Sequence, residues 1–210
     1  MTSTEKPRRL RPEKRRAIVD AARAAFGKLG YVRAGTDAIA AEAGVSTRTL
    51  YNHFPTKLDL FRSVFTEGAA TVAAGFTERI DALPGGADAE STVRGIARAL
   101  VAHRLDFPEH FAMARYADIE REHFPAETFD HWRTSGPQAV TRAVTARLER
   151  LTADGLLATA DPGEAADQLI LLIAGAVAFR QRPGVTVSEH DAERIVRSGV
   201  RTFLYGHSPR

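Results

Sequence analysis

The stretch Thr36–Lys57 constrains the fold of this chain more than any other, because it combines two short helical patterns with a glycine between them. Gly44 supplies the backbone freedom that a helix stop requires. Ser46 can then cap a second helix by accepting a hydrogen bond from a free backbone N–H. In that helix Leu50 and Phe54 lie four residues apart and are expected to face inward. The pattern predicts a helix-turn-helix.

The second helix of this pair leaves its polar and aromatic donors on or near the exposed side. These residues are Thr47, Arg48, Thr49, Tyr51, Asn52 and His53. In the major groove of DNA an arginine such as Arg48 can pair with guanine, and a threonine such as Thr47 can pack on a thymine methyl group. Exposed donors on a short helix after a glycine turn are typical of a recognition helix.

The run Gly44-Val45-Ser46-Thr47-Arg48-Thr49-Leu50-Tyr51-Asn52-His53-Phe54, followed by Lys57 and Leu58, resembles the signature of the TetR family of transcriptional regulators. The resemblance covers about residues 12–65. It implies that Tyr51 and His53 hold DNA phosphates, and that Lys57 does so at the start of the next helix. Thr36 is predicted to cap the first helix of the pair and to contact phosphate. Asn52 departs from the family pattern, which leaves its role open between base contact and solvent. The predicted DNA-binding set is therefore Thr36, Ser46, Thr47, Arg48, Thr49, Tyr51, Asn52, His53 and Lys57.

Charge is distributed unevenly along the chain. The net charge is +3, but residues 1–57 hold twelve Lys/Arg against five Asp/Glu, a net of +7, and the remainder has a net of −4. A basic segment on a mildly acidic body is expected when only that segment meets a polyanion. Residues 1–11 are predicted to be a basic tail, either solvated and disordered or acting as an arm that touches DNA. The absence of cysteine excludes disulfides and thiolate metal sites.

The rest of the chain shows helical spacing and no strand-like alternation, so the predicted fold class is all-α. We assign residues 12–57 to the DNA-binding domain and about 57–83 to a linking helix. We assign residues 58–206 to a helical body, with segments predicted near 89–106, 109–121, 126–152, 162–180 and 189–205. The family resemblance implies that this body is an effector-binding and dimerisation domain. The Gly136-Pro137 pair predicts a kink or a split in the third of these segments.

Family resemblance implies that the body encloses a small-molecule pocket. The candidate lining residues are the aromatic side chains Phe107, Phe111, Tyr116, Phe129 and Trp132. Aromatic side chains commonly line such pockets, but ordinary core packing explains any one of them equally well. Between Phe124 and Gly175 the sequence also weakly resembles the AefR-like type of C-terminal domain.

No nucleophile motif, phosphate-binding glycine loop or dinucleotide fingerprint occurs, so neither catalytic residues nor a cofactor are predicted. The pairs Asp106/His110 and Glu127/His131 are each spaced four apart on predicted helices. Metal ligation needs three or four converging groups, so we predict ion pairs or local hydrogen bonds there and no metal site.

The longest apolar run, Leu169–Phe179, has eleven residues, which is too short to span a bilayer. A helix without a polar face must be covered on every side. The cover is either the core of one chain or a second chain, packed through the last two long helices. Small residues that would allow a close approach are Ala174, Gly175, Ala176 and Ala178.

These features together predict a cytoplasmic DNA-binding regulator, nucleoid-associated when on DNA. The preferred form is a small-molecule-responsive repressor that binds a palindromic double-stranded operator as a homodimer, with no membrane contact. Two alternatives stay open. One is an effector-independent, nucleoid-associated DNA binder, and the other, less favoured, is a helical enzyme with a vestigial head.

Overall fold

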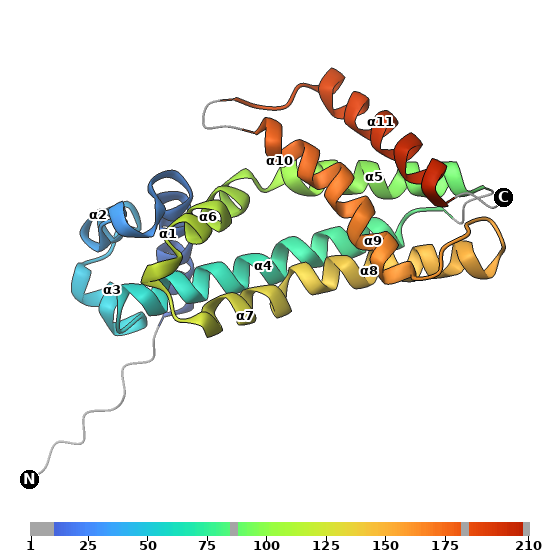
Figure 1. Cartoon of the computed structure of the whole chain (residues 1–210). Helices are drawn as coiled ribbons and strands as arrows, with labels where there is room; N and C mark the ends of the chain where they lie inside the picture. The colour runs from blue at the N-terminus through green and yellow to red at the C-terminus, as the bar shows by residue number, and fades with distance from the viewer. Residues whose placement is uncertain (1–10, 85–87, 182–184, 208–210) are drawn as a thin grey trace, which may run out of the picture. The chain divides into compact units, whose positions relative to one another are not determined.

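A computed structural model describes residues 11–84, 88–181 and 185–207, and each regular element in these ranges is a helix (Figure 1). The all-α prediction is confirmed. Apart from Arg11, the predicted basic tail lies outside the described residues.

The helices follow one another closely along the chain. Their bounds are α1 Pro12–Arg33, α2 Thr36–Glu42, α3 Thr47–His53, α4 Lys57–Asp81, α5 Ala89–Asp106, α6 Pro108–Ile119, the 3₁₀ turn η1 Arg121–His123, α7 Ala126–Ser135, α8 Pro137–Ala153, α9 Pro162–Ile170, the π-helical turn η2 Leu171–Gly175, α10 Ala176–Arg180 and α11 Glu189–His207. The helical segments predicted for the body are confirmed, with the third one split at Gly136. The prediction that Asp106 and His110 lie on one helix is wrong, because α5 ends at Asp106 and α6 begins at Pro108.

The chain forms two compact units. Of the described residues, the head unit comprises 11–67 and 109–128, and the body unit comprises 68–84, 88–108, 129–181 and 185–207. The head unit therefore contains α1–α3 and the start of α4, together with α6 and η1. The predicted division after residue 57 stays a functional prediction, because it concerns DNA and effector binding rather than compactness.

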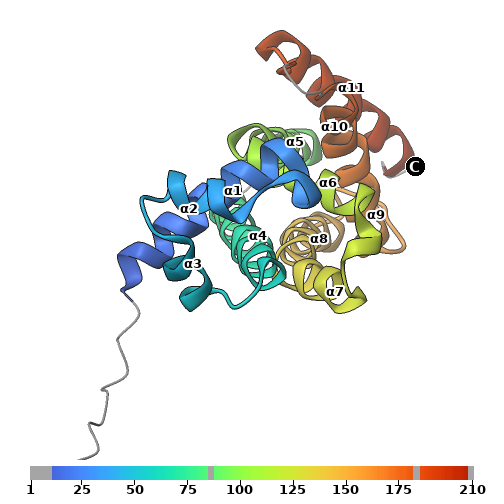
Figure 2. The same ribbon diagram turned by 90° about the vertical axis from the view of Figure 1, so that its left-hand side faces the viewer.

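Aromatic packing explains why residues 109–128 belong to the head unit. The ring of Phe124 stacks on Phe61 at a centroid distance of 4.5 Å and lies 4.8 Å from Tyr31. Phe26 joins the same cluster, with its centroid 5.1 Å from that of Phe61. These rings bury large apolar areas, so the segment that carries Phe124 stabilises the helices of the head. In the same unit α1, α2 and α3 are grouped around one another (Figure 2).

Side chains cap several of the helices, and the predicted cap at Ser46 is confirmed. Ser46 accepts from the N–H of Thr49, and Asp161 accepts from two N–H groups at the start of α9. Thr56 and Asp59 form a reciprocal pair in which each side chain accepts from the other's backbone N–H, at 3.0 and 3.1 Å. The predicted cap at Thr36 is wrong: Gly35 occupies the N-cap position of α2 and no side chain caps this helix.

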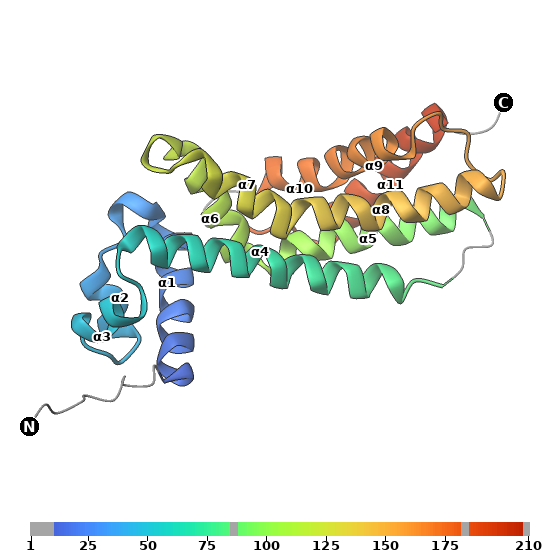
Figure 3. The same cartoon turned by 90° about the horizontal axis from the view of Figure 1, so that it is seen from below.

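The body unit has its own hydrophobic core. It is built from apolar side chains of α5, α8, α9 and α11 and of the α4 residues Ala73, Phe76 and Ile80. In this unit α9 packs against α8, as Figure 3 shows, and α11 packs against α5. The predicted break between α7 and α8 is confirmed at Gly136, whose φ of −130° and ψ of −77° are not helical.

The segment Pro162–Arg180 runs through α9, η2 and α10 without a turn between them. By length and composition the whole segment is apolar enough to cross a membrane, although the eleven-residue apolar run within it is too short to do so. Its residues Leu169, Ile173 and Val177 are fully buried in the body core. We therefore interpret it as a core helix that leaves one apolar side uncovered.

Candidate nucleic-acid interface

The corner between α2 and α3 is shaped by Gly44. Its φ is +64°, in the left-handed region that glycine adopts without a steric penalty. The N–H groups of Gly44 and Val45 donate to the carbonyl oxygens of Ala41 and Ala40, at 3.1 and 3.0 Å. These two bonds close the C-terminus of α2 in the manner of a glycine cap. The helix-turn-helix geometry predicted from this glycine is present.

Two apolar side chains fix the orientation of α3. Leu50 is fully buried and Phe54 is 4% exposed, so the inward face of the helix is the predicted one. Ser46 holds the N-terminus through Thr49, whose hydroxyl also lies 2.9 Å from the Ser46 hydroxyl. The opposite face of α3 is thereby turned to solvent.

Two hydrogen bonds join α3 to the start of α2. The hydroxyl of Thr47 donates to the Asp37 carboxylate at 2.8 Å, and the hydroxyl oxygens of Thr36 and Tyr51 are 3.1 Å apart. The second bond joins two residues predicted to contact DNA and the first involves one of them, so both bonds orient predicted DNA-binding groups before DNA arrives. Asp37 was not among the predicted residues. No local pattern reveals it, because its partner lies on the next helix.

Arg48 and Asn52 are exposed one helical turn apart on α3. Neither forms a hydrogen bond or an ion pair within the part of the chain that the structure describes. Their side chains are therefore available for base edges, and Asn52 lies on the same face as Arg48. Its role stays a prediction.

His53 lies half-buried at the end of α3. Burial lowers the pKa of His53 below its usual 6.5, and the nearby positive charges of Arg15 and Lys14 lower this pKa further. The imidazole is therefore mostly neutral at pH 7 in the absence of DNA.

We expect DNA binding to tighten as the pH falls, because a phosphate beside His53 would raise its pKa and favour proton uptake on binding. This gain in DNA affinity is absent at pH values above the His53 pKa of the DNA-bound protein. It is complete at pH values below the His53 pKa of the free protein. At constant ionic strength, the Kd for a mixed-sequence duplex should fall about fivefold between about pH 7.5 and about pH 5.5. His53→Gln should remove this dependence. An equal pH dependence in both proteins would contradict the assignment.

Lys57 begins α4 and is held by the end of α1. Its ammonium group donates to the carbonyl oxygen of Val32 at 3.2 Å and lies 4.7 Å from the centroid of the Tyr31 ring. Burial lowers the pKa of Lys57, and the carboxylate of Glu120 opposes this by raising it. An ammonium group at a helix N-terminus is well placed for a phosphate.

The basic residue Arg15 forms its contacts with other residues of the head unit. It pairs with the Glu67 carboxylate, donates to the Ser63 hydroxyl at 2.9 Å and lies 5.3 Å from the Phe54 ring centroid. The hydrogen bond from Arg15 is the main reason why the pKa of Glu67 is lowered. Arg15 therefore ties α1 to α4, and Lys14 and Arg16 beside it remain exposed.

The five aromatic residues predicted to line an effector pocket are all half-buried, and they are divided between the units. Phe111 and Tyr116 belong to the head unit, and Phe107, Phe129 and Trp132 belong to the body unit. The pocket stays a prediction. Within residues 11–84, 88–181 and 185–207, no group of three His, Cys, Asp or Glu side chains is arranged to hold a metal ion.

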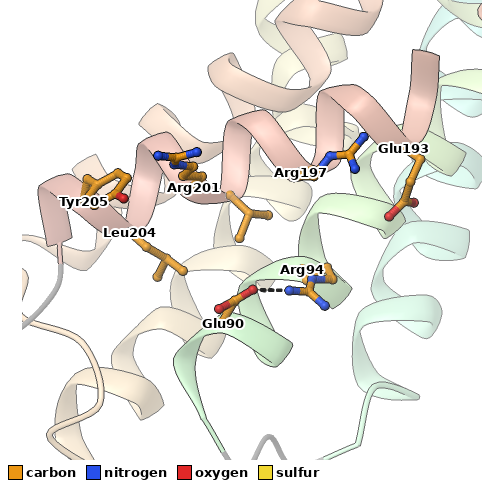
Figure 4. A pocket seen from close by; sticks show the side chains of 8 residues that line it. Glu90, Arg94, Glu193, Arg197, Arg201, Leu204 and Tyr205 are labelled. Atoms are coloured by element: carbon orange, nitrogen blue, oxygen red, sulfur yellow. Dashed lines mark hydrogen bonds and ion pairs between the residues drawn. The ribbon is translucent and has the colours of Figure 1, made fainter. Parts of the chain in front are cut away.

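The body unit has an open groove between α5 and α11 (Figure 4). Its lining residues are mostly charged: Glu90, Arg94, Glu193, Arg197, Val200, Arg201, Leu204 and Tyr205. Glu90 pairs with Arg94, and the guanidinium of Arg201 lies 5.4 Å from the ring centroid of Tyr205. None of the five predicted aromatic residues contributes, so this groove is not the predicted pocket.

Comparison with known proteins assigns the helix-turn-helix and the body to one family. Residues 18–64 match the family described as bacterial regulatory proteins, tetR family, and residues 91–207 match the AefR-like transcriptional repressor C-terminal domain. The chain belongs to the TetR family of transcriptional regulators. It is thus a DNA-binding regulator and not an enzyme, as the sequence predicted.

Individual relatives agree with this assignment. Over 100 residues the TetR-family chain is 35% identical to the HTH-type transcriptional activator FasR of Mycolicibacterium smegmatis, a match that covers 48% of the chain and 42% of FasR. The chain thus spans less than half of that curated relative. Among solved structures, a TetR-family regulator of Mesorhizobium loti MAFF303099 gives a TM-score of 0.80 at 27% identity, with 96% of this chain and all of that chain covered. The flavonoid-responsive regulator FrrA gives 0.68 at 29% identity, covering 95% of this chain and all of its own.

Proposed function

We propose that this chain is a homodimeric, small-molecule-responsive repressor that binds a palindromic operator in the cytoplasm. The observation that carries the proposal is the exposed face of α3, held by Ser46, Leu50 and Phe54 with Arg48 and Asn52 directed to solvent. One such face contacts one half-site, and a two-fold dimer matches a two-fold operator.

The proposed DNA contacts divide into two groups. Arg48, Asn52, Thr47 and Thr49 act on base edges or close to them, because they lie on the exposed side of α3 or in its first turn. Thr36, Ser46, Tyr51, His53 and Lys57 act on phosphates, because their polar groups lie at the helix ends or are tied to a neighbouring helix.

The proposed dimer forms through the segment α9–η2–α10 and α11. Leu171 and Phe179 are 71% and 75% exposed, and they lie two helical turns apart on one side of this segment. Between them a Cβ atom at Gly175 would meet no atom within 4 Å. Two exposed apolar side chains with a glycine between them would allow the close approach of a second copy of the chain.

The proposed effector is a small molecule with apolar surface. Half-buried aromatic side chains in the middle helices support this, since aromatic side chains commonly line such pockets. FrrA, which shares the fold over nearly the whole chain, is described as flavonoid-responsive. The effector would act by linkage, so that its binding and operator binding weaken each other equally.

Repression is the output we propose, supported by the match of residues 91–207 to a domain described from transcriptional repressors. FasR is described as an activator, so the direction of regulation needs its own measurement. A promoter fused to a reporter gene would be silenced by a repressor and released when the gene for this chain is deleted.

Selection of bound fragments from genomic DNA tests the whole proposal. A specific regulator should enrich a few fragments that share an inverted repeat, and titration with candidate compounds should release them. Enrichment of many unrelated fragments with no effector response would favour the nucleoid-associated alternative instead.

Arg48→Ala should relax base preference at one position in each half-site. The expected loss is about 1–3 kcal/mol for the preferred base, which is the contribution of a good bidentate pair with guanine. Selection from a randomised operator library measures this directly. Arg16→Ala, which removes an equal charge from an exposed position on α1, is the control and should preserve the sequence preference. An unchanged preference in Arg48→Ala would refute the assignment.

A further inference from the structure

The turn at the end of α1 connects two charged side chains from distant parts of the sequence. Gly30 has φ +79° and ψ 177°, which interrupts the helical path of α1. The next N–H, of Tyr31, donates to the Glu120 carboxylate at 2.6 Å, and the carbonyl of Val32 accepts from Lys57 at 3.2 Å. One short turn is therefore bonded to Glu120 on one side and to Lys57 on the other.

The carboxylate of Glu120 fits closely against this turn. A Cβ atom at Gly30 would lie 2.7 Å from one carboxylate oxygen and 3.0 Å from the other, so only glycine leaves room for it. Tyr31 is also fixed through its ring, which packs against Phe61 and Phe124. The turn is thus held by both the backbone and the side chain of Tyr31.

Lys57 depends on the turn for its position. Its ammonium group bonds to Val32 and lies over the ring of Tyr31, and both contacts involve residues adjacent to the N–H that Glu120 holds. A long lysine side chain has many rotamers in water, so two contacts of this kind select among them.

We propose that Glu120 is a positioning residue for DNA binding: its carboxylate holds the Gly30–Val32 turn, and this turn holds the ammonium group of Lys57 where it meets a DNA phosphate. The inference rests on the proposed role of Lys57. It assigns a function in DNA binding to a residue between η1 and α6, far in sequence from the helix-turn-helix.

Repulsion between the Glu120 carboxylate and DNA phosphates would have the opposite effect on DNA binding. A carboxylate near DNA repels phosphates, so its removal should tighten binding if electrostatic repulsion were its main contribution. Positioning requires the hydrogen bond to Tyr31, whatever the charge of the acceptor. Two substitutions therefore separate the two effects.

Glu120→Gln removes the charge and keeps an oxygen that can accept from Tyr31. Glu120→Asp keeps the charge and withdraws the acceptor by about 1.5 Å, the length of one carbon–carbon bond. We expect Glu120→Asp to raise the Kd for a mixed-sequence duplex about tenfold, and Glu120→Gln to leave it within about twofold of the original. Fluorescence anisotropy across a salt series provides both the Kd and its salt dependence.

The salt dependence identifies the phosphate contact. Each lost contact lowers the slope of log K against log salt concentration by about 0.9. Lys57→Ala and Glu120→Asp should each lower the slope by about this amount, and the double variant should lower it no further. Glu127→Asp is the matched control, since Glu127 lies in the same segment but pairs with Arg62 at 2.6 Å. Circular dichroism melts verify that all variants are folded at the assay temperature.

If Lys57→Ala leaves the slope unchanged, the phosphate contact is wrong and the positioning role falls with it. If Lys57→Ala lowers the slope and Glu120→Asp does not, only the positioning role is wrong. Tighter binding by Glu120→Gln together with normal binding by Glu120→Asp would show that Glu120 acts through its charge alone and overturn the inference.

Discussion

Gly175→Glu is expected to convert the proposed dimer into monomers and to abolish tight binding to the proposed operator. The substitution should not disturb the monomer, because a Cβ atom at Gly175 meets no atom within 4 Å. In a dimer the new carboxylate would lie between the exposed side chains of Leu171 and Phe179, in an apolar contact. Two-fold symmetry introduces this charge twice, and burying an unpaired charge costs several kcal/mol. The dimer Kd should therefore rise on the order of 10³-fold.

Light scattering coupled to gel filtration measures the mass, and gel shift with the selected operator measures the consequence for DNA. Ala153→Glu is the control, because it adds the same charge at an exposed position of α8 in the same unit. It should remain dimeric and bind the operator normally. A Gly175→Glu protein that still has the mass of a dimer would rule out this interface.

Gly136→Ala should destabilise the folded chain strongly. A Cβ atom at Gly136 would lie 2.8 Å from the Cβ of Ala69, 2.9 Å from its carbonyl oxygen and 3.1 Å from its carbonyl carbon. These are atoms of the α4 backbone or attached directly to it, so no flexible side chain can move aside. Overpacking of this kind costs about 1–3 kcal/mol, and a rigid neighbour places the expected loss at about 3 kcal/mol.

Urea unfolding followed by circular dichroism measures this loss. Gly75→Ala provides the comparison, since its Cβ atom would meet only Phe107, at an ordinary 3.9 Å. Alanine in the interior of a helix is favoured over glycine by about 1 kcal/mol, so Gly75→Ala should be neutral or stabilising. Equal stabilities for the two variants would mean that the start of α8 can shift away from α4 at little cost.

Local signals explain why so much of the fold follows from the sequence. Gly44 and Ser46 act within a few residues of their own positions, and the structure places both as predicted. The Gly136-Pro137 break is local as well. Helix starts and stops depend on such short-range hydrogen bonds and backbone preferences, which can be predicted from the neighbouring residues in the sequence.

The errors and omissions involve contacts between elements. Thr36 has the side chain of a cap, but its hydroxyl bonds to Tyr51 fifteen residues away. The bond from Tyr31 to Glu120 spans 89 residues. Periodicity assigns a residue to the inner face of a helix but does not say which neighbour that face meets. For the same reason it did not reveal that Phe111 and Tyr116 belong to a different unit from Phe107.

The head unit is assembled from two separate stretches of the chain, and this limits how evolution or an engineer can exchange it. The chain passes between the units after residues 67, 108 and 128. A fragment that ends within α4 keeps α2 and α3 but loses Phe124, the stacking partner of Phe61, together with Glu120. A chimaera that joins this helix-turn-helix to another body should therefore carry residues 109–128 as well. The DNA sequence preference proposed for this protein therefore depends on two separate stretches of the chain rather than on the N-terminal stretch alone.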